Sequence, residues 1–150
     1  MAEITAAAVR AFREKTGLPL MDCKRALTEA HGDEEKAIEM LRKAGEKLEA
    51  KRADRVTEFG RFGIYAGLDK STGAMVELKC ESAPVTQNDE FIRLANDLAQ
   101  QLATGPGAAT ADELLAQASP SQPGATLAQQ KADLFNRIRE VFNIGRMVRI

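Results

Sequence analysis

Histidine and cysteine, the residue types that most often carry chemistry, are sparse in this sequence. The single histidine, His31, stands beside Gly32 where a helix is expected to end, and neither cysteine lies at a spacing that would complete a metal site with it. Cys23 and Cys80 follow the apolar faces of regular elements, so we expect reduced, buried thiols rather than a disulfide or an activated nucleophile. A small thiol enzyme is the alternative that this pattern leaves open.

Nucleotide, nucleic-acid and membrane chemistry also lack a signal. The glycines at 60, 63, 67, 73, 105 and 107 fit neither the dinucleotide nor the Walker spacing, so we expect no cofactor. A formal net charge of −1, with 29% charged residues, gives no basic excess for phosphate backbones, which argues against direct nucleic-acid binding. No stretch approaches the roughly 18 apolar residues of a membrane span, and we expect a cytoplasmic protein that acts by binding another protein.

The most specific signal is the stretch from Thr16 to Leu27, a turn that leads into an amphipathic helix. Its apolar residues recur at spacings of three and four and predict one buried stripe: Leu20, Cys23, Ala26, Leu27 and Ala30. Met21 lies about 100° round the helix from Leu20, at or beyond the edge of this stripe. Two interpretations stay open, an adaptable contact with a partner and a side chain that folds back over the edge of the core.

Helix signals around this stretch predict a three-helix module over residues 1–45. Thr5 is suited to cap a first helix over 6–15, and Gly17 to end it. The second helix ends near His31, and Asp33 caps a third helix that stops before Gly45. Residues 46–55 are charged and rich in alanine, which indicates a solvated, partly helical linker, with a basic contact patch as the alternative.

The apolar period changes from helical to alternating after Gly60. A β-hairpin is expected over 61–80, with these side chains on its buried face: Phe62, Ile64, Ala66, Leu68, Val76, Leu78 and Cys80. The turn between the strands is Asp69-Lys70-Ser71-Thr72-Gly73. Because two strands alone are marginal in water, a helix must cover them. The fold class that these elements predict is α+β.

Further helices follow the hairpin and supply that cover. We expect one from Asn88 or Asp89 to the glycines after residue 104, a short one after Thr110, and a longer one after Thr126. The apolar residues that should face inward from the last segment are Leu127, Leu134, Phe135, Ile138, Val141 and Phe142. A strand should open at Met147, and residues 56–150 form the second part of the chain.

A polar bend, residues 81–88, joins the hairpin to the helix after it. Ala83 precedes Pro84 and is therefore pushed out of the α region, so we expect extended backbone at Ala83 and a rigid loop at one end of the sheet. A plain connector and a functional loop are both consistent with this composition.

The residues now described resemble the bacterial translation elongation factor Ts family. The runs that match its ubiquitin-associated-type module are Ala2-Glu3-Ile4-Thr5, Thr16-Gly17, Met21-Asp22-Cys23-Lys24-Arg25-Ala26-Leu27-Thr28-Glu29-Ala30, Gly32-Asp33, Ala37-Ile38 and Leu41-Arg42-Lys43. Beyond them, Gly63-Ile64, Val76-Glu77-Leu78 and Cys80 are similar to the first hairpin of the family's core, and Phe91 and Ala95 to the helix after it. The likeness runs along essentially the whole chain.

This resemblance implies a non-enzymatic nucleotide exchange factor that promotes GDP release from the GTPase elongation factor Tu. It implies that the module docks on the partner's nucleotide domain and that the loop after the hairpin wedges near the phosphate site. The expected partner-binding residues are Phe12, Leu20, Met21, Ser82, Ala83, Pro84 and Val85. Residues 56–150 would then be the amino-terminal half of the family's core.

Two departures from the family pattern qualify this expectation. The loop reads Ser82-Ala83-Pro84-Val85 where the family has Thr-Asp-Phe-Val, and Ala and Pro supply neither a carboxylate nor an aromatic contact area. A binding adaptor of the same fold without exchange activity is therefore the alternative function. Family members usually continue into a second core half, and Ile150 precedes that region. We therefore expect either a piece of a longer protein or a short form that pairs as a homodimer.

Overall fold

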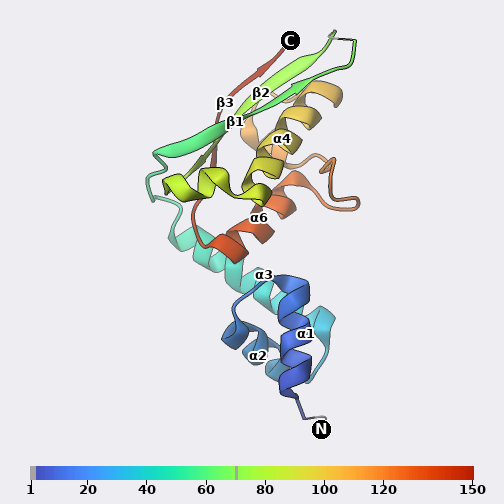
Figure 1. Cartoon of the computed structure of the whole chain (residues 1–150), viewed down its shortest axis with the longest axis vertical. Helices are drawn as coiled ribbons and strands as arrows, with labels where there is room; N and C mark the ends of the chain where they lie inside the picture. Colours follow the sequence, from blue (N-terminus) through green and yellow to red (C-terminus); the bar gives the residue numbers. More distant parts are fainter. Residues whose placement is uncertain (1–2, 70) are drawn as a thin grey trace.

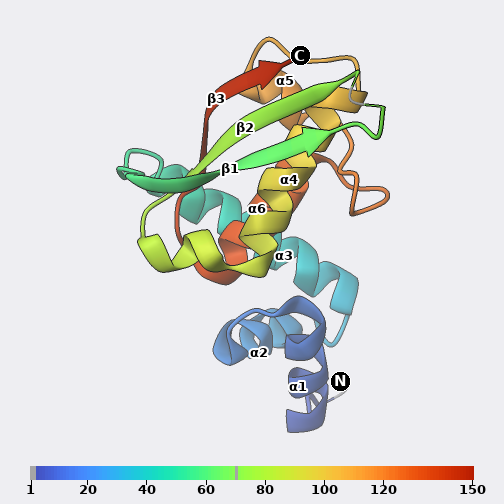
Figure 2. The same cartoon turned by 45° about the horizontal axis from the view of Figure 1, so that its top comes forward.

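The computed structural model describes residues 3–69 and 71–150 and has its helical module at one end and its sheet at the other (Figure 1). Three helices come first, α1 (Ala6–Thr16), α2 (Leu20–Glu29) and α3 (Glu34–Lys51). A three-stranded antiparallel sheet packed against further helices follows, and Figure 2 shows α4 (Asp89–Thr104) lying across it. The predicted α+β class is confirmed.

Local capping signals correctly place the ends of the first helices. The Thr5 side chain accepts a hydrogen bond from the Ala8 amide at 3.1 Å, and Gly17 adopts a left-handed φ of 67°. Asp33 caps α3 by accepting from the Lys36 amide at 3.2 Å. His31 and Gly32, both at positive φ, form the reversal after α2, as the sequence predicts for this helix end.

The third helix differs from the prediction because it passes through Gly45 and ends at Lys51. Gly45 is buried against the side chain of Asn136, so its missing side chain admits a neighbouring helix instead of ending its own. Leu48 packs on the core beneath the sheet, and Glu49 pairs with Lys131 of the last helix at 3.0 Å. Residues 46–51 are therefore helical and pack through Leu48 and Glu49, while their other four side chains are exposed. The division of the chain at residues 45 and 55 stays a prediction.

The sheet contains β1 (Phe59–Ala66), β2 (Gly73–Cys80) and β3 (Asn143–Arg149), in the order β1-β2-β3. Met75 of the central strand faces Ile64 on one side and Val148 on the other. The hairpin is confirmed, although Lys70 of its predicted turn lies outside the described residues. The last strand begins at Asn143, four residues before Met147, where it was expected.

The buried face of β1 is the opposite of the one predicted. Gly63 is buried against α4 (Asp89–Thr104), whereas Phe62 and Ile64 on either side of it are exposed on the outer face. A Cβ at Gly63 would overlap the carbonyl of Ala95, so the close approach of α4 needs glycine on the inner face. The alternating period was therefore read correctly, but the side was wrong.

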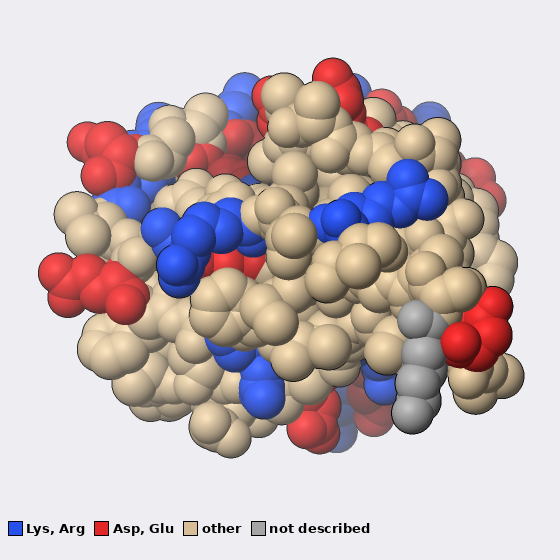
Figure 3. Space-filling model, turned by 90° about the horizontal axis from the view of Figure 1, so that it is seen from above, with Lys and Arg blue, Asp and Glu red and all other residues tan. Residues whose placement is uncertain are grey.

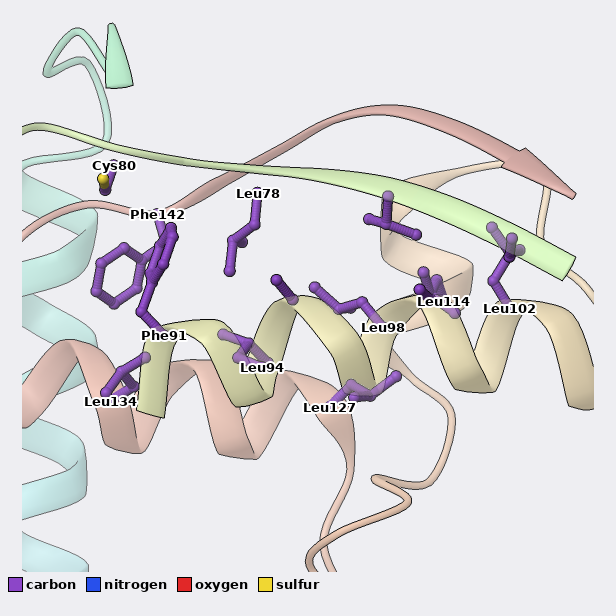
Figure 4. Close-up of a cluster of buried hydrophobic side chains, with 14 of the residues drawn as sticks. Leu78, Cys80, Phe91, Leu94, Leu98, Leu102, Leu114, Leu127, Leu134 and Phe142 are labelled. Carbon is purple, nitrogen blue, oxygen red and sulfur yellow. The ribbon is translucent and has the colours of Figure 1, made fainter. Parts of the chain in front are cut away.

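Inner side chains of β2 and the helices form the larger of two cores (Figure 4). Val76, Leu78 and Cys80 point from β2 toward α4, while α5 (Ala111–Leu115) and α6 (Leu127–Ile138) close the other side. Phe91 and Phe142 meet with their ring centroids 5.5 Å apart. The smaller core joins α1, α2 and α3: Val9, Phe12, Leu18, Cys23, Ala26, Leu27, Ala30 and Ala37.

The last helix is shorter than predicted, since α6 ends at Ile138. Arg139 takes a left-handed φ of 64° and its amide donates to the Phe135 carbonyl at 2.7 Å, which stops the helix. Val141 and Phe142 are buried as expected, but from the extended segment that leads into β3.

Candidate protein-binding site

The first turn of α2 presents two large apolar side chains to the surface. Leu20 is 43% exposed and Met21 64%, whereas Cys23, Ala26 and Leu27 of the same helix are buried. Pro19 is the N-cap of the helix, so the exposed pair stands at its start. Met21 does not fold back over the core, and the interpretation of an accessible side chain holds; its contact with a partner is a separate question.

Phe12 was expected among the partner-binding residues, and the structure corrects this expectation. Its side chain is 0% exposed and lies in the core of the module with Val9 and Cys23. A buried phenyl ring fixes the packing of α1 on α2 and cannot touch a partner while the module is folded. Phe12 therefore supports the surface pair without belonging to the surface.

The loop after the hairpin forms a 3-10 helix, η1 (Ala83–Gln87). Extended backbone ends one residue earlier than predicted, at Ser82 with φ −128° and ψ 152°, and Pro84 occupies the first turn. Ala83 and Pro84 are exposed, while Val85 is partly buried against the core. Ala83 and Pro84, which replace the acidic and aromatic residues of the family pattern, thus face solvent.

Hydrogen bonds from distant parts of the chain hold this loop. Glu140 accepts from the amides of Glu81 and Ser82 at 3.1 and 2.9 Å and from the Ser82 hydroxyl at 2.5 Å. Arg61 of β1 donates to the Thr86 carbonyl at 2.8 Å. Both views place η1 and α2 on the same side of the molecule (Figures 1 and 2).

Cys80 lies directly beneath the loop and is chemically quiet. Its side chain is fully buried, and the Sγ donates to the Ser82 carbonyl at 3.2 Å. Burial, and then the nearby Glu140 carboxylate, raise the pKa of the thiol to about 11. A protonated, enclosed thiol is a poor nucleophile, so Cys80 is not activated for attack. Across the described part of the chain, no group of three or more His, Cys, Asp or Glu is placed to hold a metal ion.

A second apolar surface covers the outer face of the sheet. Phe62, Ile64, Met75 and Val148 are exposed side by side on three adjacent strands. In Figure 3 this end of the molecule is largely uncharged, with a few Lys and Arg side chains across it.

Glu77 forms two ion pairs within this outer face, with Arg146 and, at 3.8 Å, with Lys79. Arg146 stacks 5.4 Å from the centre of the Phe62 ring and donates to Glu77 at 2.8 Å. The hydrogen bonds that Glu77 accepts from the side chain and the backbone amide of Arg146 hold the pKa of the Glu77 carboxyl below its usual range. Because Arg146 is paired with Glu77, the apolar side chains around it remain the main feature of this face.

Sequence reasoning missed three side chains near the start of α2 and the loop η1 that bind other segments: Asn136, Arg139 and Glu140. The partners of the last two lie 117 residues (Asp22) and 58 residues (Ser82) away in the sequence, so no local pattern points to them. Within the described residues, no helix is long and apolar enough to cross a membrane.

Comparison with known proteins identifies the family. No family model matches the chain. It is 42% identical over 151 residues to elongation factor Ts of Bordetella petrii, covering 100% of this chain and 50% of that protein. It is 41% identical over 146 residues to elongation factor Ts of Clostridium botulinum, covering 97% and 47%.

A third relative shows higher identity over a shorter stretch. The elongation factor Ts of Oleidesulfovibrio alaskensis is 52% identical over 103 residues, which cover 69% of this chain and 52% of that protein. The chain spans about half the length of the curated relatives it matches. Together with the α+β fold and the three-helix module, these identities show that the chain belongs to the elongation factor Ts family.

Proposed function

We propose that this chain is a nucleotide exchange factor, not an enzyme, that docks on the GTPase elongation factor Tu and promotes GDP release. The observation that carries the proposal is the exposed apolar pair Leu20–Met21 at the start of α2, a helix whose other large apolar side chain, Leu27, is buried. Exposed apolar side chains on a rigid helix are the kind of anchor that protein interfaces use. Family membership supplies the identity of the partner.

Exchange follows from linkage between the two binding events. A factor that binds the nucleotide-free GTPase more tightly than the GDP complex must weaken GDP binding by the same free energy. The factor itself needs no nucleotide site and no cofactor. Its contribution is two surfaces in a fixed arrangement, the start of α2 and the loop η1.

The alternative function is a binding adaptor that docks without exchange. It is favoured by one observation, the exposed Ala83 and Pro84, which offer neither charge nor a large contact area. The two functions differ in a single assay, the release of fluorescent GDP from the purified GTPase at increasing concentrations of the chain. Faster release supports exchange, binding without faster release supports the adaptor, and no binding contradicts both.

We further propose that the outer face of the sheet contacts a second copy of the chain. Support comes from the contiguous apolar side chains of Phe62, Ile64, Met75 and Val148, since such patches usually mark protein contacts. Light scattering should show a dimer for the wild type and a monomer for Ile64→Lys. Leu68→Lys, at a fully exposed turn residue, is the matched control and should stay dimeric. A monomeric wild type contradicts this proposal.

A further inference from the structure

Two consecutive residues, Arg139 and Glu140, connect the start of α2 with the loop η1. The Arg139 Nη2 donates to the Asp22 Oδ2 at 3.2 Å, and Asp22 is the neighbour of Met21. The Glu140 carboxylate receives three hydrogen bonds from Glu81 and Ser82. The two surfaces proposed to bind the partner are thus held by adjacent side chains of one segment.

Arg139 is itself fixed from several directions. Its Nε donates to the Asn136 carbonyl at 2.9 Å, and its own carbonyl accepts from Arg52 at 2.9 Å. The left-handed backbone, with φ 64°, is unfavourable for a residue with a side chain and persists only where the surroundings impose it. The segment is therefore a rigid junction of α3, α6 and α2.

Glu140 fixes the loop in a similar way. Glu81, whose amide it binds, returns a contact by accepting from the Val141 amide at 3.4 Å, and Arg55 lies 3.6 Å from the Glu81 carboxylate. Ser82 is the last extended residue before η1, so bonds to its amide and hydroxyl set the direction in which Ala83 and Pro84 leave the sheet.

From this geometry we infer that Arg139 and Glu140 are positioning residues that hold the α2 surface and the η1 loop in one frame. The inference rests on the proposed function for its purpose, but its structural part concerns the free chain alone. Arg139 fixes α2 and Glu140 fixes η1, so each substitution should release one surface and leave the other in place.

The structural test is nuclear magnetic resonance of the free chain. Asp22→Asn removes the negative charge that accepts from Arg139, and Arg139→Gly removes the donor, so the two changes weaken the same contact from opposite ends. Glycine accepts the left-handed backbone at residue 139 without strain. Both should reduce the residual dipolar couplings of α2 against those of the sheet and leave η1 unchanged. Glu140→Ala should speed exchange of the Glu81 and Ser82 amides about tenfold or more and leave α2 unchanged.

The matched control is Glu90→Gln, which removes a carboxylate that pairs with Arg137 of α6 at the surface of the second part of the chain. It should alter neither α2 nor η1. Unchanged α2 couplings in both Asp22→Asn and Arg139→Gly contradict the role of Arg139. Unchanged amide exchange in Glu140→Ala contradicts the role of Glu140.

The functional arm uses GDP release from elongation factor Tu. At saturating chain, Arg139→Gly and Glu140→Ala should each lower the maximal release rate about tenfold, because a displaced surface no longer meets its target in register. The dissociation constant for the GTPase should rise less than about threefold, since Leu20 and Met21 remain. Equal loss of affinity and rate contradicts a positioning role. If the wild type itself does not accelerate GDP release, the proposed function is contradicted. The residual dipolar couplings still test separately whether Arg139 fixes the orientation of α2 relative to the sheet.

Discussion

Gly45 and Asn136 lie against each other where α3 crosses α6. The Asn136 amide donates to the Leu41 carbonyl at 3.2 Å, one turn before Gly45. Its buried Oδ1 has no hydrogen-bond partner among the residues that the structure describes. A Cβ at Gly45 would overlap this side chain. Glycine here has a packing role, which is why the helix that sequence reasoning ended at residue 45 continues to Lys51.

Gly45→Ala should therefore destabilise the chain although alanine is the better helix former. Helix propensity favours alanine by about 1 kcal/mol, whereas overpacking a tight contact costs about 1–3 kcal/mol. We expect the free energy of unfolding, measured with urea, to fall by about 1 kcal/mol. Combining it with Asn136→Ala, which removes the obstructing amide, should cost less than the two single changes together. A more stable Gly45→Ala chain would show that the helices do not meet here.

Gly63→Ala should be more damaging, because the atom that a Cβ would overlap is the Ala95 backbone carbonyl and cannot rotate away. We expect a loss of about 3 kcal/mol or more in the free energy of unfolding, at the upper end of overpacking costs. Gly67→Ala is the control, since its Cβ would meet the Thr72 Oγ1 at 3.1 Å in the hairpin turn, where a side chain can shift. Equal effects at both positions would contradict the close packing of β1 on α4.

Cys80 should resist alkylation at neutral pH in the folded chain and react only after unfolding. Its pKa of about 11 in the folded state lies above the ordinary thiol pKa of 9.0, so the unfolded chain loses its thiol proton first as the pH rises. The stabilising contribution is complete below about pH 9 and is lost as the pH rises toward 11. Cys80→Ala should remove this part of the pH dependence. Rapid alkylation of the native chain would instead revive the thiol-enzyme alternative.

The altered loop offers a gain-of-function prediction. Ala83 and Pro84 are exposed, so Ala83→Asp with Pro84→Phe can restore the family's acidic and aromatic residues without disturbing the core. If the loop limits exchange, the maximal rate of GDP release should rise about tenfold, within the usual range of coupling between sites. The free energy of unfolding should change by less than about 1 kcal/mol, as for most surface substitutions. No gain in release rate would indicate that the loop does not act on the GTPase.

The parts of the fold that could be predicted are those with local signals. Thr5, Gly17 and Asp33 mark helix ends by hydrogen bonds within four residues, and alternation with a polar turn marks the hairpin. Helical geometry places Met21 at or beyond the edge of the stripe that includes Cys23, but the structure decides between an accessible side chain and one folded over the core.

The parts that could not be predicted depend on residues far apart in the sequence. Alternation gives the period of β1 but not its buried side, which the approach of Ala95 to Gly63 decides. Phe12 could be placed on an apolar stripe, but its complete burial follows from the packing of three helices. The hydrogen bonds of Arg139 and Glu140 link segments that are 117 and 58 residues apart, so the spacing of residues in the sequence does not indicate them.

Docking through the start of α2, followed by GDP release, is the central claim, and Met21→Glu tests it most directly. The measurement is the rate of GDP release from elongation factor Tu at increasing concentrations of wild-type and variant chains, with Met21→Leu as the apolar control and thermal unfolding as the check on folding. We predict that the wild type and Met21→Leu accelerate GDP release. Met21→Glu should need an about tenfold higher concentration for the same rate or give no acceleration, while its thermal unfolding temperature stays unchanged. A folded Met21→Glu chain as active as the wild type would contradict the claim.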